Sequence, residues 1–374
     1  MKKNKHIDVY SKLVYAKFKS RLNVLRKGLT KKENILKRVT IKDIAKECGV
    51  STTTVSRVLN NKVGCCAPET EKRILEAVAK TNFRPNPAAR AMVTKKTNII
   101  GVILPDIYNY YFQDLFKGAE NYLSENGYSL ILCNTDGNPK KEREFLLSLS
   151  QGMVDGIIVT TANRAENNKV ILELTAKGMP VVTVERYGKD LADIPKVCFD
   201  NKNAMVQAVE VLYNNGHKRI AFLQGPSEAY NAKLRYEGYQ EGLRKVGISL
   251  DETLVVQGDY KMDSGEHITQ VLLQRTEFTA IIASNDLMAL GACKAIRKAG
   301  RSVPEDISVI GFDGTLLAEM HQPPLATIVL HGYDMGSASA ENLLCMINKK
   351  GDVEKEILFM PELRMGNSIR NLNN

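Results

Sequence analysis

The spacing of apolar residues changes near residue 98, and this change divides the chain into a helical front and an α/β body. In the front, apolar residues recur three and four positions apart, which is the spacing of one helix face. From Asn98 onward short β-branched runs alternate with helical segments; the runs are "IIGVIL", "YSLILC", "GIIVT", "PVVTV", "RIAFL", "LVVQG", "AIIAS" and "ISVIGF". This alternation predicts parallel sheets built from βαβ units, in two doubly wound lobes with a ligand cleft at the carboxyl ends of the strands.

The front contains two predicted helices joined by a tight turn, within "TIKDIAKECGVSTTTVSRVLN" (residues 40–60). Thr40 is the expected N-cap of the first helix, whose apolar face comprises Ile41, Ile44, Ala45 and Cys48. Gly49 supplies the left-handed residue that ends this helix, and Ser51 caps the second. The buried side of the second helix comprises Val55, Val58 and Leu59. A small residue, a turn glycine and a branched apolar residue in this order predict a helix-turn-helix.

The exposed side of the second helix is rich in hydroxyl and β-branched residues, each of which costs roughly 0.5 kcal/mol of helix propensity relative to alanine. Short side chains let a helix lie deep in a DNA major groove, where threonine contacts base edges and Arg57 can donate two hydrogen bonds to guanine. The pattern predicts a recognition helix, and the alternative is a solvated polar face on a small helical domain. The DNA-binding candidates here are Thr40, Ser51, Thr52, Thr53, Thr54, Ser56, Arg57 and Asn60.

Two further helical segments follow in the front. A third helix is expected over roughly residues 68–80, with Pro68 in its first position and with Ile74, Leu75 and Val78 in the small core. The next segment, "RPNPAARAMV" (84–93), is too short to be stable alone, because an isolated helix needs about 12 or more residues in water. It therefore folds only with outside help, or else it is a simple linker.

Charge is distributed unevenly along the chain, which carries +10 overall. Residues 1–38 hold 13 Lys/Arg and 2 acidic residues, residues 39–97 hold 11 and 5, and the remainder holds 28 and 35. A basic front joined to a mildly acidic body indicates a polyanion-binding head on a soluble domain. The basic extension 1–38 has three interpretations: an arm that binds DNA phosphates, a tail without a role, or an amphipathic helix on a membrane surface.

The cysteines and the apolar runs bear on the compartment. Seven scattered cysteines favour a reducing cytoplasm over a disulfide framework, with the adjacent Cys65 and Cys66 as an alternative redox pair. No stretch approaches about 18 consecutive apolar residues, and the N-terminus lacks a secretory apolar segment. We therefore expect a cytoplasmic protein that does not span a membrane.

Six motifs, in this order, resemble the lactose-repressor (LacI/GalR) family of bacterial transcription regulators: "TIKDIAKECGVSTTTVSRVLN", "NFRPNPAARAM", "GYSLILCNTDGN", "VDGIIV", "SNDLMALGA" and "VPEDISVIGFD". The resemblance runs from about residue 39 to the C-terminus. It implies a homodimeric repressor whose two heads read a near-palindromic operator, under control of a small carbohydrate-like effector between the lobes. It also implies that the short helix is a hinge over the DNA minor groove, with Asn86, Arg90 and Met92 as contacts. Met92 stands where the family usually has a leucine wedge.

Residues that follow the predicted strands are the effector-site candidates. Arginine with several Asp and Asn side chains around an aromatic ring can bind a neutral polyol through hydrogen bonds and stacking. The resemblance assigns Tyr111, Phe112, Arg235 and Tyr260 to effector contacts. The strand ends add Arg186, Asp200, Asn231, Asn285 and Asp313. The alternative for each candidate is a core residue, a helix cap or an ion pair that bridges the lobes.

The sequence shows no catalytic arrangement, because its five histidines are isolated and it lacks nucleophile-elbow, phosphate-loop and zinc-type cysteine motifs. We therefore expect no enzyme, no metal and no cofactor. A sugar-binding transport protein with the same two-lobed body, and control by a protein co-regulator, are the alternatives. The expected domains are the extension 1–38, the head 39–84, a hinge and linker 85–97, and an effector-binding and dimerisation body 98–374. The expected lobes of that body are roughly 98–199 plus 331–357, and 200–330 plus 358–374.

Overall fold

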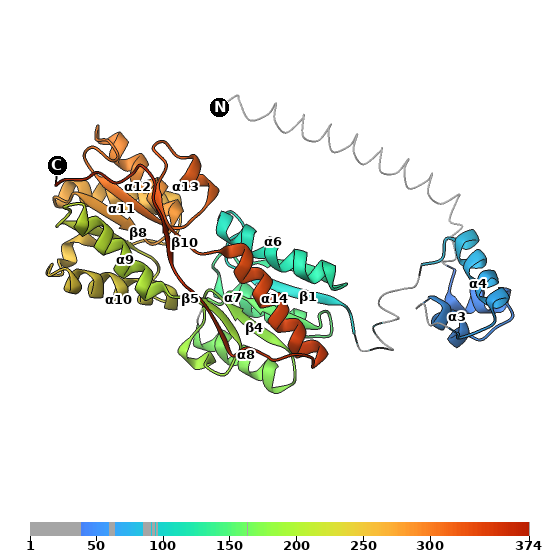
Figure 1. Cartoon of the computed structure of the whole chain (residues 1–374). Coiled ribbons are helices and arrows are strands. Elements are labelled where there is room, and N and C mark those ends of the chain that lie inside the picture. Colours follow the sequence, from blue (N-terminus) through green and yellow to red (C-terminus); the bar gives the residue numbers. More distant parts are fainter. Residues whose placement is uncertain are drawn as a thin grey trace, which may run out of the picture. The chain divides into compact units, whose positions relative to one another are not determined.

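The structure is a computed structural model that describes residues 39–59, 64–84, 91, 94, 96–162 and 164–373. The chain divides after Thr94 into two units, a small helical head and a large α/β body (Figure 1). The extension 1–38, most of the expected hinge, and the candidates Asn60, Asn86, Arg90 and Met92 lie outside the described residues.

The described part of the head contains three helices: α2 (Ile41–Glu47), α3 (Thr52–Leu59) and α4 (Pro68–Thr81). Gly49 has a φ of 63° in the turn between the first two, which is the left-handed conformation that the sequence predicts there. One small core holds the helices together and consists of Ile44, Ala45, Cys48, Val55, Val58, Ile74 and Ala77. The expectation that Leu75 joins this core is wrong: its side chain is 48% exposed, because Ala77 occupies the inward position on that turn of α4.

The first lobe of the body is built on a parallel six-stranded sheet of order β11-β5-β4-β3-β1-β2. Its strands are β1 (Ile99–Leu104), β2 (Ser129–Asn134), β3 (Gly156–Val159), β4 (Val181–Val184), β5 (Lys196–Phe199) and β11 (Glu356–Phe359). Helices α6 (Tyr110–Glu125) and α14 (Gly332–Asn348) lie side by side on one face (Figure 1), and α7 (Pro139–Leu149) and α8 (Ala165–Ala176) cover the other. Neighbouring strand residues alternate between the faces: Val102 packs in the core beneath α6, and Ile103 in the core beneath α7.

The second lobe repeats this plan with sheet order β12-β10-β9-β8-β6-β7. Its strands are β6 (Ile220–Gln224), β7 (Val255–Gln257), β8 (Ala280–Ala283), β9 (Ser308–Asp313), β10 (Ala326–Val329) and the antiparallel β12 (Glu362–Arg364). Helices α9 (Asn201–Asn214) and α10 (Tyr230–Lys245) pair with each other, as do α11 (Met262–Arg275) and α12 (Asp286–Lys298), and a short α13 (Leu316–Met320) follows β9. The two lobes confirm the predicted fold class.

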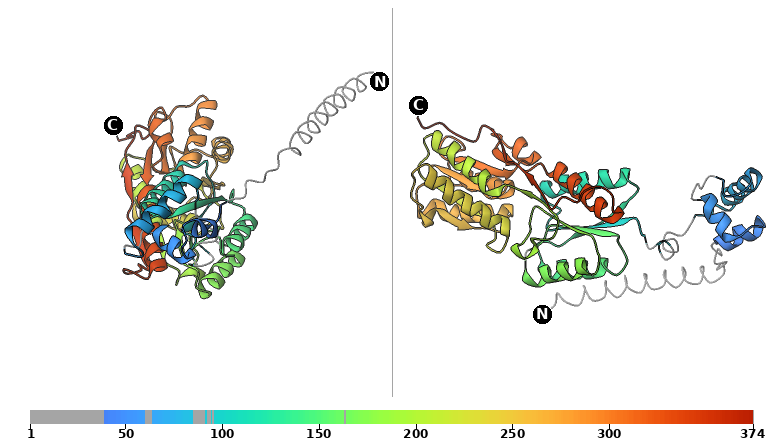
Figure 2. Two further views of the ribbon diagram at one scale, coloured as in Figure 1. Left: turned by 90° about the vertical axis from the view of Figure 1, so that its right-hand side faces the viewer. Right: turned by 60° about the horizontal axis from the view of Figure 1, so that its bottom comes forward.

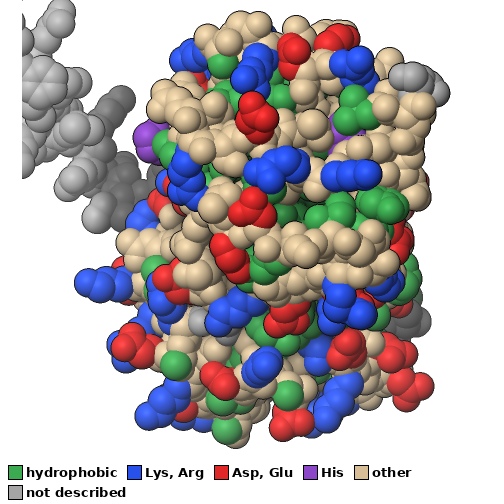
Figure 3. Space-filling view, turned by 90° about the vertical axis from the view of Figure 1, so that its left-hand side faces the viewer, with side chains coloured by type: hydrophobic (Ala, Val, Ile, Leu, Met, Phe, Trp, Pro, Cys, Tyr) green, Lys and Arg blue, Asp and Glu red, His purple; other side chains and the backbone are tan. Residues whose placement is uncertain are grey.

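The chain passes between the lobes three times, after β5, after β10 and after β11 (Figure 2). The boundary expected at residue 357 lies inside β11, so the last passage comes after Phe359. On the face of the molecule shown in Figure 3, acidic and basic side chains are interspersed and form no extended patch of one sign.

Candidate functional site

The predicted recognition helix α3 has an exposed polar side. Thr52, Thr53 and Arg57 are exposed, while Thr54 and Ser56 are half-buried. Ser51 caps the helix, because its Oγ accepts a hydrogen bond from the backbone N–H of Thr54 at 3.1 Å. At the start of α2 the Thr40 hydroxyl donates to the Asp43 carboxylate at 2.7 Å. Val55 and Val58 lie in the core, so the opposite side of α3 is available to a partner.

In the body, the carboxyl ends of both sheets bring a polar cluster together, and Arg235 of α10 is at its centre. The Arg235 side chain is only 2% exposed. Its Nε donates to Asn201 Oδ1 at 2.7 Å, and its Nη1 donates to the carbonyl oxygen of Ser284. Its guanidinium carbon lies 3.8 Å from the centroid of the Phe312 ring. Packing and hydrogen bonds therefore fix this cation in one orientation.

Glu185 is a residue of this cluster that sequence analysis missed. It follows β4 in the first lobe, is 3% exposed, and forms an ion pair with Arg235 Nη2 of the second lobe at 3.4 Å. Asn231 Nδ2, also of the second lobe, donates to the same carboxylate. Glu185 has a φ of 61°, a strained conformation that non-glycine residues keep only where the surroundings enforce it. Its place directly before Arg186 at a strand end was the signal that could have identified it.

Arg186 points toward the cleft from the same loop, and its side chain is 14% exposed. Its guanidinium carbon lies 4.9 Å from the ring centroid of Tyr260 in the second lobe and 5.6 Å from that of Phe112 in the first. The Tyr260 hydroxyl donates to Asn231 Oδ1 at 3.2 Å. The structure thus brings together five predicted candidates, namely Phe112, Arg186, Asn231, Arg235 and Tyr260.

Asp313 ends β9 next to this cluster and has a φ of 122°. Its Oδ2 accepts a hydrogen bond from Asn109 Nδ2 of the first lobe at 3.2 Å. Burial, the nearby Asp286 carboxylate and, to a smaller extent, Glu185 raise the pKa of Asp313 well above its usual range. Burial also raises the pKa of Asp286 to about 6, although Thr327 and Thr315 donate hydrogen bonds to it.

Three predicted candidates have other contacts in this structure. Asp200 caps α9 by accepting from Asn203 N at 3.0 Å, and Asn285 caps α12 by accepting from Met288 N at 2.9 Å. Asn285 remains next to the cluster, since its Nδ2 donates to the Tyr260 carbonyl at 2.8 Å. Tyr111 lies in the core of the first lobe, where its hydroxyl contacts Met335 Sδ at 3.5 Å.

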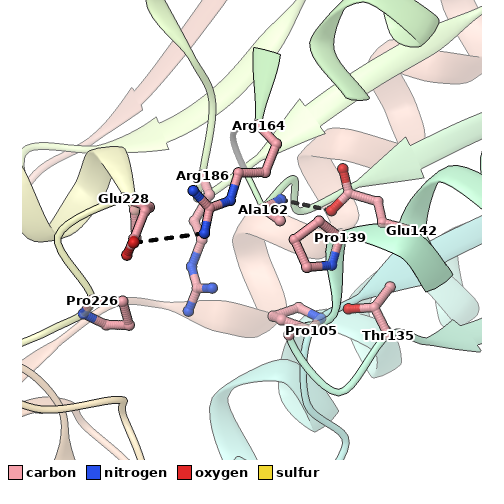
Figure 4. A pocket seen from close by; sticks show the side chains of 11 residues that line it. Pro105, Thr135, Pro139, Glu142, Ala162, Arg164, Arg186, Pro226 and Glu228 are labelled. Carbon is pink, nitrogen blue, oxygen red and sulfur yellow. Dashed lines mark hydrogen bonds and ion pairs between the residues drawn. The ribbon is translucent and has the colours of Figure 1, made fainter. Parts of the chain in front are cut away.

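A cavity of about 90 Å³ opens at the mouth of the cleft (Figure 4). First-lobe residues line one side of this cavity, namely Pro105, Thr135, Gly137, Pro139, Glu142, Ala162, Arg164 and Arg186. Second-lobe residues line the other side, namely Pro226, Glu228 and Ala229. Among the described residues, no group of three or more His, Cys, Asp or Glu side chains is placed to hold a metal ion. Within the same part of the chain, no helix has the length and apolar character that a membrane span needs.

Comparison with known proteins identifies both units. Residues 40–86 match the family described as "Bacterial regulatory proteins, lacI family", and residues 97–364 match "Periplasmic binding proteins and sugar binding domain of LacI family". The chain belongs to the LacI family. This LacI-family protein is a transcriptional regulator and not an enzyme, which confirms the family and the function class that the sequence motifs predict.

Individual relatives match this LacI-family regulator over most of its length. Catabolite control protein A of Priestia megaterium is 37% identical over 86% of this chain and 96% of its own. The ribose operon repressor of Halalkalibacterium halodurans is 36% identical over 83% of this chain and 91% of its own. Among solved structures, the Lac repressor dimer bound to operator and an anti-inducer matches with a TM-score of 0.80, at 27% identity, over 89% of this chain and all of that one.

Proposed function

We propose that this LacI-family regulator is a cytoplasmic homodimeric repressor that binds a near-palindromic operator. A small carbohydrate-like effector lowers or raises its affinity for that operator. The observation that carries the DNA-binding part is the geometry of α3, whose branched residues are buried while Thr52, Thr53 and Arg57 face outward. Threonine and arginine at these positions suit direct contacts with base edges in a major groove.

Exposed apolar side chains on the body support a homodimer. On the second lobe Leu316 and Met320 of α13 are 53% and 68% exposed, and Met365 is 57% exposed. On the first lobe the exposed apolar residues include Ile107, Tyr108 and Leu132. In this proposal a second copy covers these residues, since contiguous apolar patches mark interaction surfaces. In this proposal the expected hinge residues Asn86, Arg90 and Met92 of two copies pair over the centre of the operator.

The cleft supports control by a polyhydroxylated effector. Arg235, Asn231 and Arg186 place polar groups at the cleft, and the Tyr260 and Phe112 rings, over which Arg186 lies, add aromatic surface beside them. Relatives fit this assignment, since similar solved structures include a LacI-family regulator of Enterococcus faecium with bound ribose, at 29% identity and a TM-score of 0.66. An effector that binds the open and closed lobes with different affinity shifts their populations.

Selection of operator sequences from a random DNA library by the full-length protein tests this proposal. The expected result is a near-palindromic consensus, bound with an affinity that falls as salt rises because phosphate contacts release counterions. Binding of the selected duplex is then measured with and without a panel of sugars. Absence of any selected sequence, together with tight sugar binding, would instead support a solute carrier with the same body.

A further inference from the structure

The cavity at the cleft mouth is too small for a whole effector but large enough for one polar group. Pockets that hold small molecules usually enclose about 300–1,000 Å³, against about 90 Å³ here. Three prolines and three small residues form part of its wall, so its chemistry depends on five polar side chains: Thr135, Glu142, Arg164, Arg186 and Glu228. Figure 4 shows the two arginines side by side between Glu228 and Glu142.

Arg186 lines this cavity with a side chain that is 14% exposed. Its Nε forms an ion pair with Glu185 Oε2 at 3.0 Å, while Glu185 Oε1 is engaged by Asn231 and Arg235. In the described part of the chain this buried Nε has no hydrogen-bond acceptor in suitable geometry. A buried donor without an acceptor is costly, so a ligand oxygen that accepts from Arg186 would be favoured.

Arg164 and Glu228 face each other across the mouth, one from each lobe. Arg164 Nη2 lies 3.6 Å from Glu228 Oε1, and both side chains are about half exposed. Arg164 precedes α8 and Glu228 precedes α10, and the N-termini of both helices lack a side-chain hydrogen-bonded cap. The Glu228 carboxylate thus places a negative charge beside Arg164, and the two residues lie next in sequence to the N-termini of α10 and α8, which favour anions.

Glu142 is the other carboxylate in the wall, and its oxygens are committed elsewhere. Oε1 accepts from Thr161 and Asn167, and Oε2 accepts from the backbone N–H of Ala162. Burial raises the pKa of Glu142, although these three hydrogen bonds oppose the shift. Glu228 is therefore the carboxylate in the wall that an anionic ligand group would have to displace.

We propose that the cleft mouth is an anion subsite, in which Arg164 and Arg186 bind a phosphate or carboxylate group carried by the effector in place of Glu228. The inference rests on the proposed effector control and narrows it to anionic polyols, such as sugar phosphates or sugar acids. The charged group of the ligand is held at the mouth, next to Arg186, whose guanidinium lies over the Tyr260 and Phe112 rings. Because Arg164 and Glu228 come from different lobes, the anion also replaces a contact that links the lobes.

Matched pairs of neutral and anionic sugars test the inference. Thermal unfolding of the full-length protein is measured with glucose and glucose 6-phosphate, ribose and ribose 5-phosphate, gluconate, and inorganic phosphate. A phosphate ester is expected to bind at least about tenfold more tightly than its parent sugar, because charge-assisted hydrogen bonds are the stronger ones. Gluconate, as a sugar acid, reports whether a carboxylate suffices in place of a phosphate.

Two substitutions with opposite expected effects check the residues. Arg164→Gln weakens binding of the phosphate ester about tenfold and leaves the parent sugar unaffected. Glu228→Gln removes the competing carboxylate and tightens binding of the ester severalfold. Arg301→Gln replaces an exposed arginine three residues beyond α12, serves as the control and changes neither. Far-UV circular dichroism and the melting temperature without ligand verify that each variant is folded.

The outcomes separate this inference from the proposed function. If neutral sugars bind as tightly as their phosphates, or if Glu228→Gln weakens binding of the ester, the anion subsite is wrong while effector control stands. If no anion in the panel stabilises the body, the subsite is also wrong. If in addition no neutral sugar stabilises it, the proposed small-molecule control fails as well.

Discussion

The buried ion pair between Glu185 and Arg235 gives a sharp prediction for the substitution Glu185→Gln. Both side chains are at least 97% buried, and the substitution keeps the shape of residue 185 while removing its charge. Removing one partner of a buried pair typically destabilises a protein by about 3–5 kcal/mol, because the other charge stays buried without compensation. Arg235 keeps its hydrogen bonds to Asn201 and Ser284 and its contact with the Phe312 ring. We therefore expect the free energy of unfolding to fall by an amount at the lower end of this range, about 3 kcal/mol.

Urea unfolding followed by far-UV circular dichroism measures this effect, since the chain has no tryptophan to report on the body. Glu173→Gln on the exposed side of α8 is the control and should change the free energy of unfolding by less than about 0.5 kcal/mol. A double-mutant cycle with Arg235→Met isolates the interaction, and the double variant should be more stable than the sum of the single effects implies. Equal stability of Glu185→Gln and the control, or additivity in the cycle, would refute the assigned coupling between the lobes.

Three further substitutions test the head, the titration of the cleft and the packing of the first lobe. Arg57→Ala should cost about 1–3 kcal/mol of operator binding and relax base preference at one position per half-site; unchanged preference in a selection experiment would contradict the assignment. Burial raises the pKa of Asp286 to about 6, above the value of about 3.9 in an unfolded chain, so the stability that its protonated form contributes is full below about pH 4 and lost as pH rises through about 6. As pH rises from 4 to 7.5, the free energy of unfolding of Asp286→Asn in urea titrations should therefore increase by about 2–3 kcal/mol relative to that of the wild type. A difference between the two proteins that stays constant with pH would oppose this. Gly118→Ala would place a Cβ 1.9 Å from the Tyr333 carbonyl oxygen, so α6 and α14 must separate and the melting temperature should fall, corresponding to about 1–3 kcal/mol; an unchanged melting temperature would show that the helices are not so closely packed.

Periodicity and turn chemistry account for how much of the fold could be predicted. The eight quoted apolar runs all coincide with strands, and Gly49 and Ser51 mark the turn of the head. The sequence pattern is a weaker guide where two apolar residues on one helix could each occupy the buried position. Leu75 and Ala77 both lie on α4, and their neighbours rather than their hydrophobicity decide which one is buried. The short strands β10, β11 and β12 were not singled out, because their pairing partners are distant in sequence.

The residues of the candidate site could likewise be predicted only in part. Rules about strand ends located Arg186, Asn231 and Asp313, because the carboxyl ends of parallel strands meet at one edge. The same rules could not tell a side chain that caps a helix, such as Asp200, from one that faces the cleft. Glu185 was missed because its role depends on Arg235, a residue 50 positions away in the other lobe. Pairing across lobes is a property of the assembled body and leaves no local pattern.

The passages of the chain between the lobes have a consequence for synthesis on the ribosome. The core cluster that the structure describes in the head lies within residues 39–83, so a nascent chain can fold this unit early. The first sheet, by contrast, receives its edge strand β11 only after residue 359 has emerged, and β12 completes the second sheet still later. Until then β5 and β10 present open edges that can pair with other chains. The part that contacts DNA is thus finished before the part that regulates it, and premature termination within the last 20 residues would leave a folded head attached to an incomplete body.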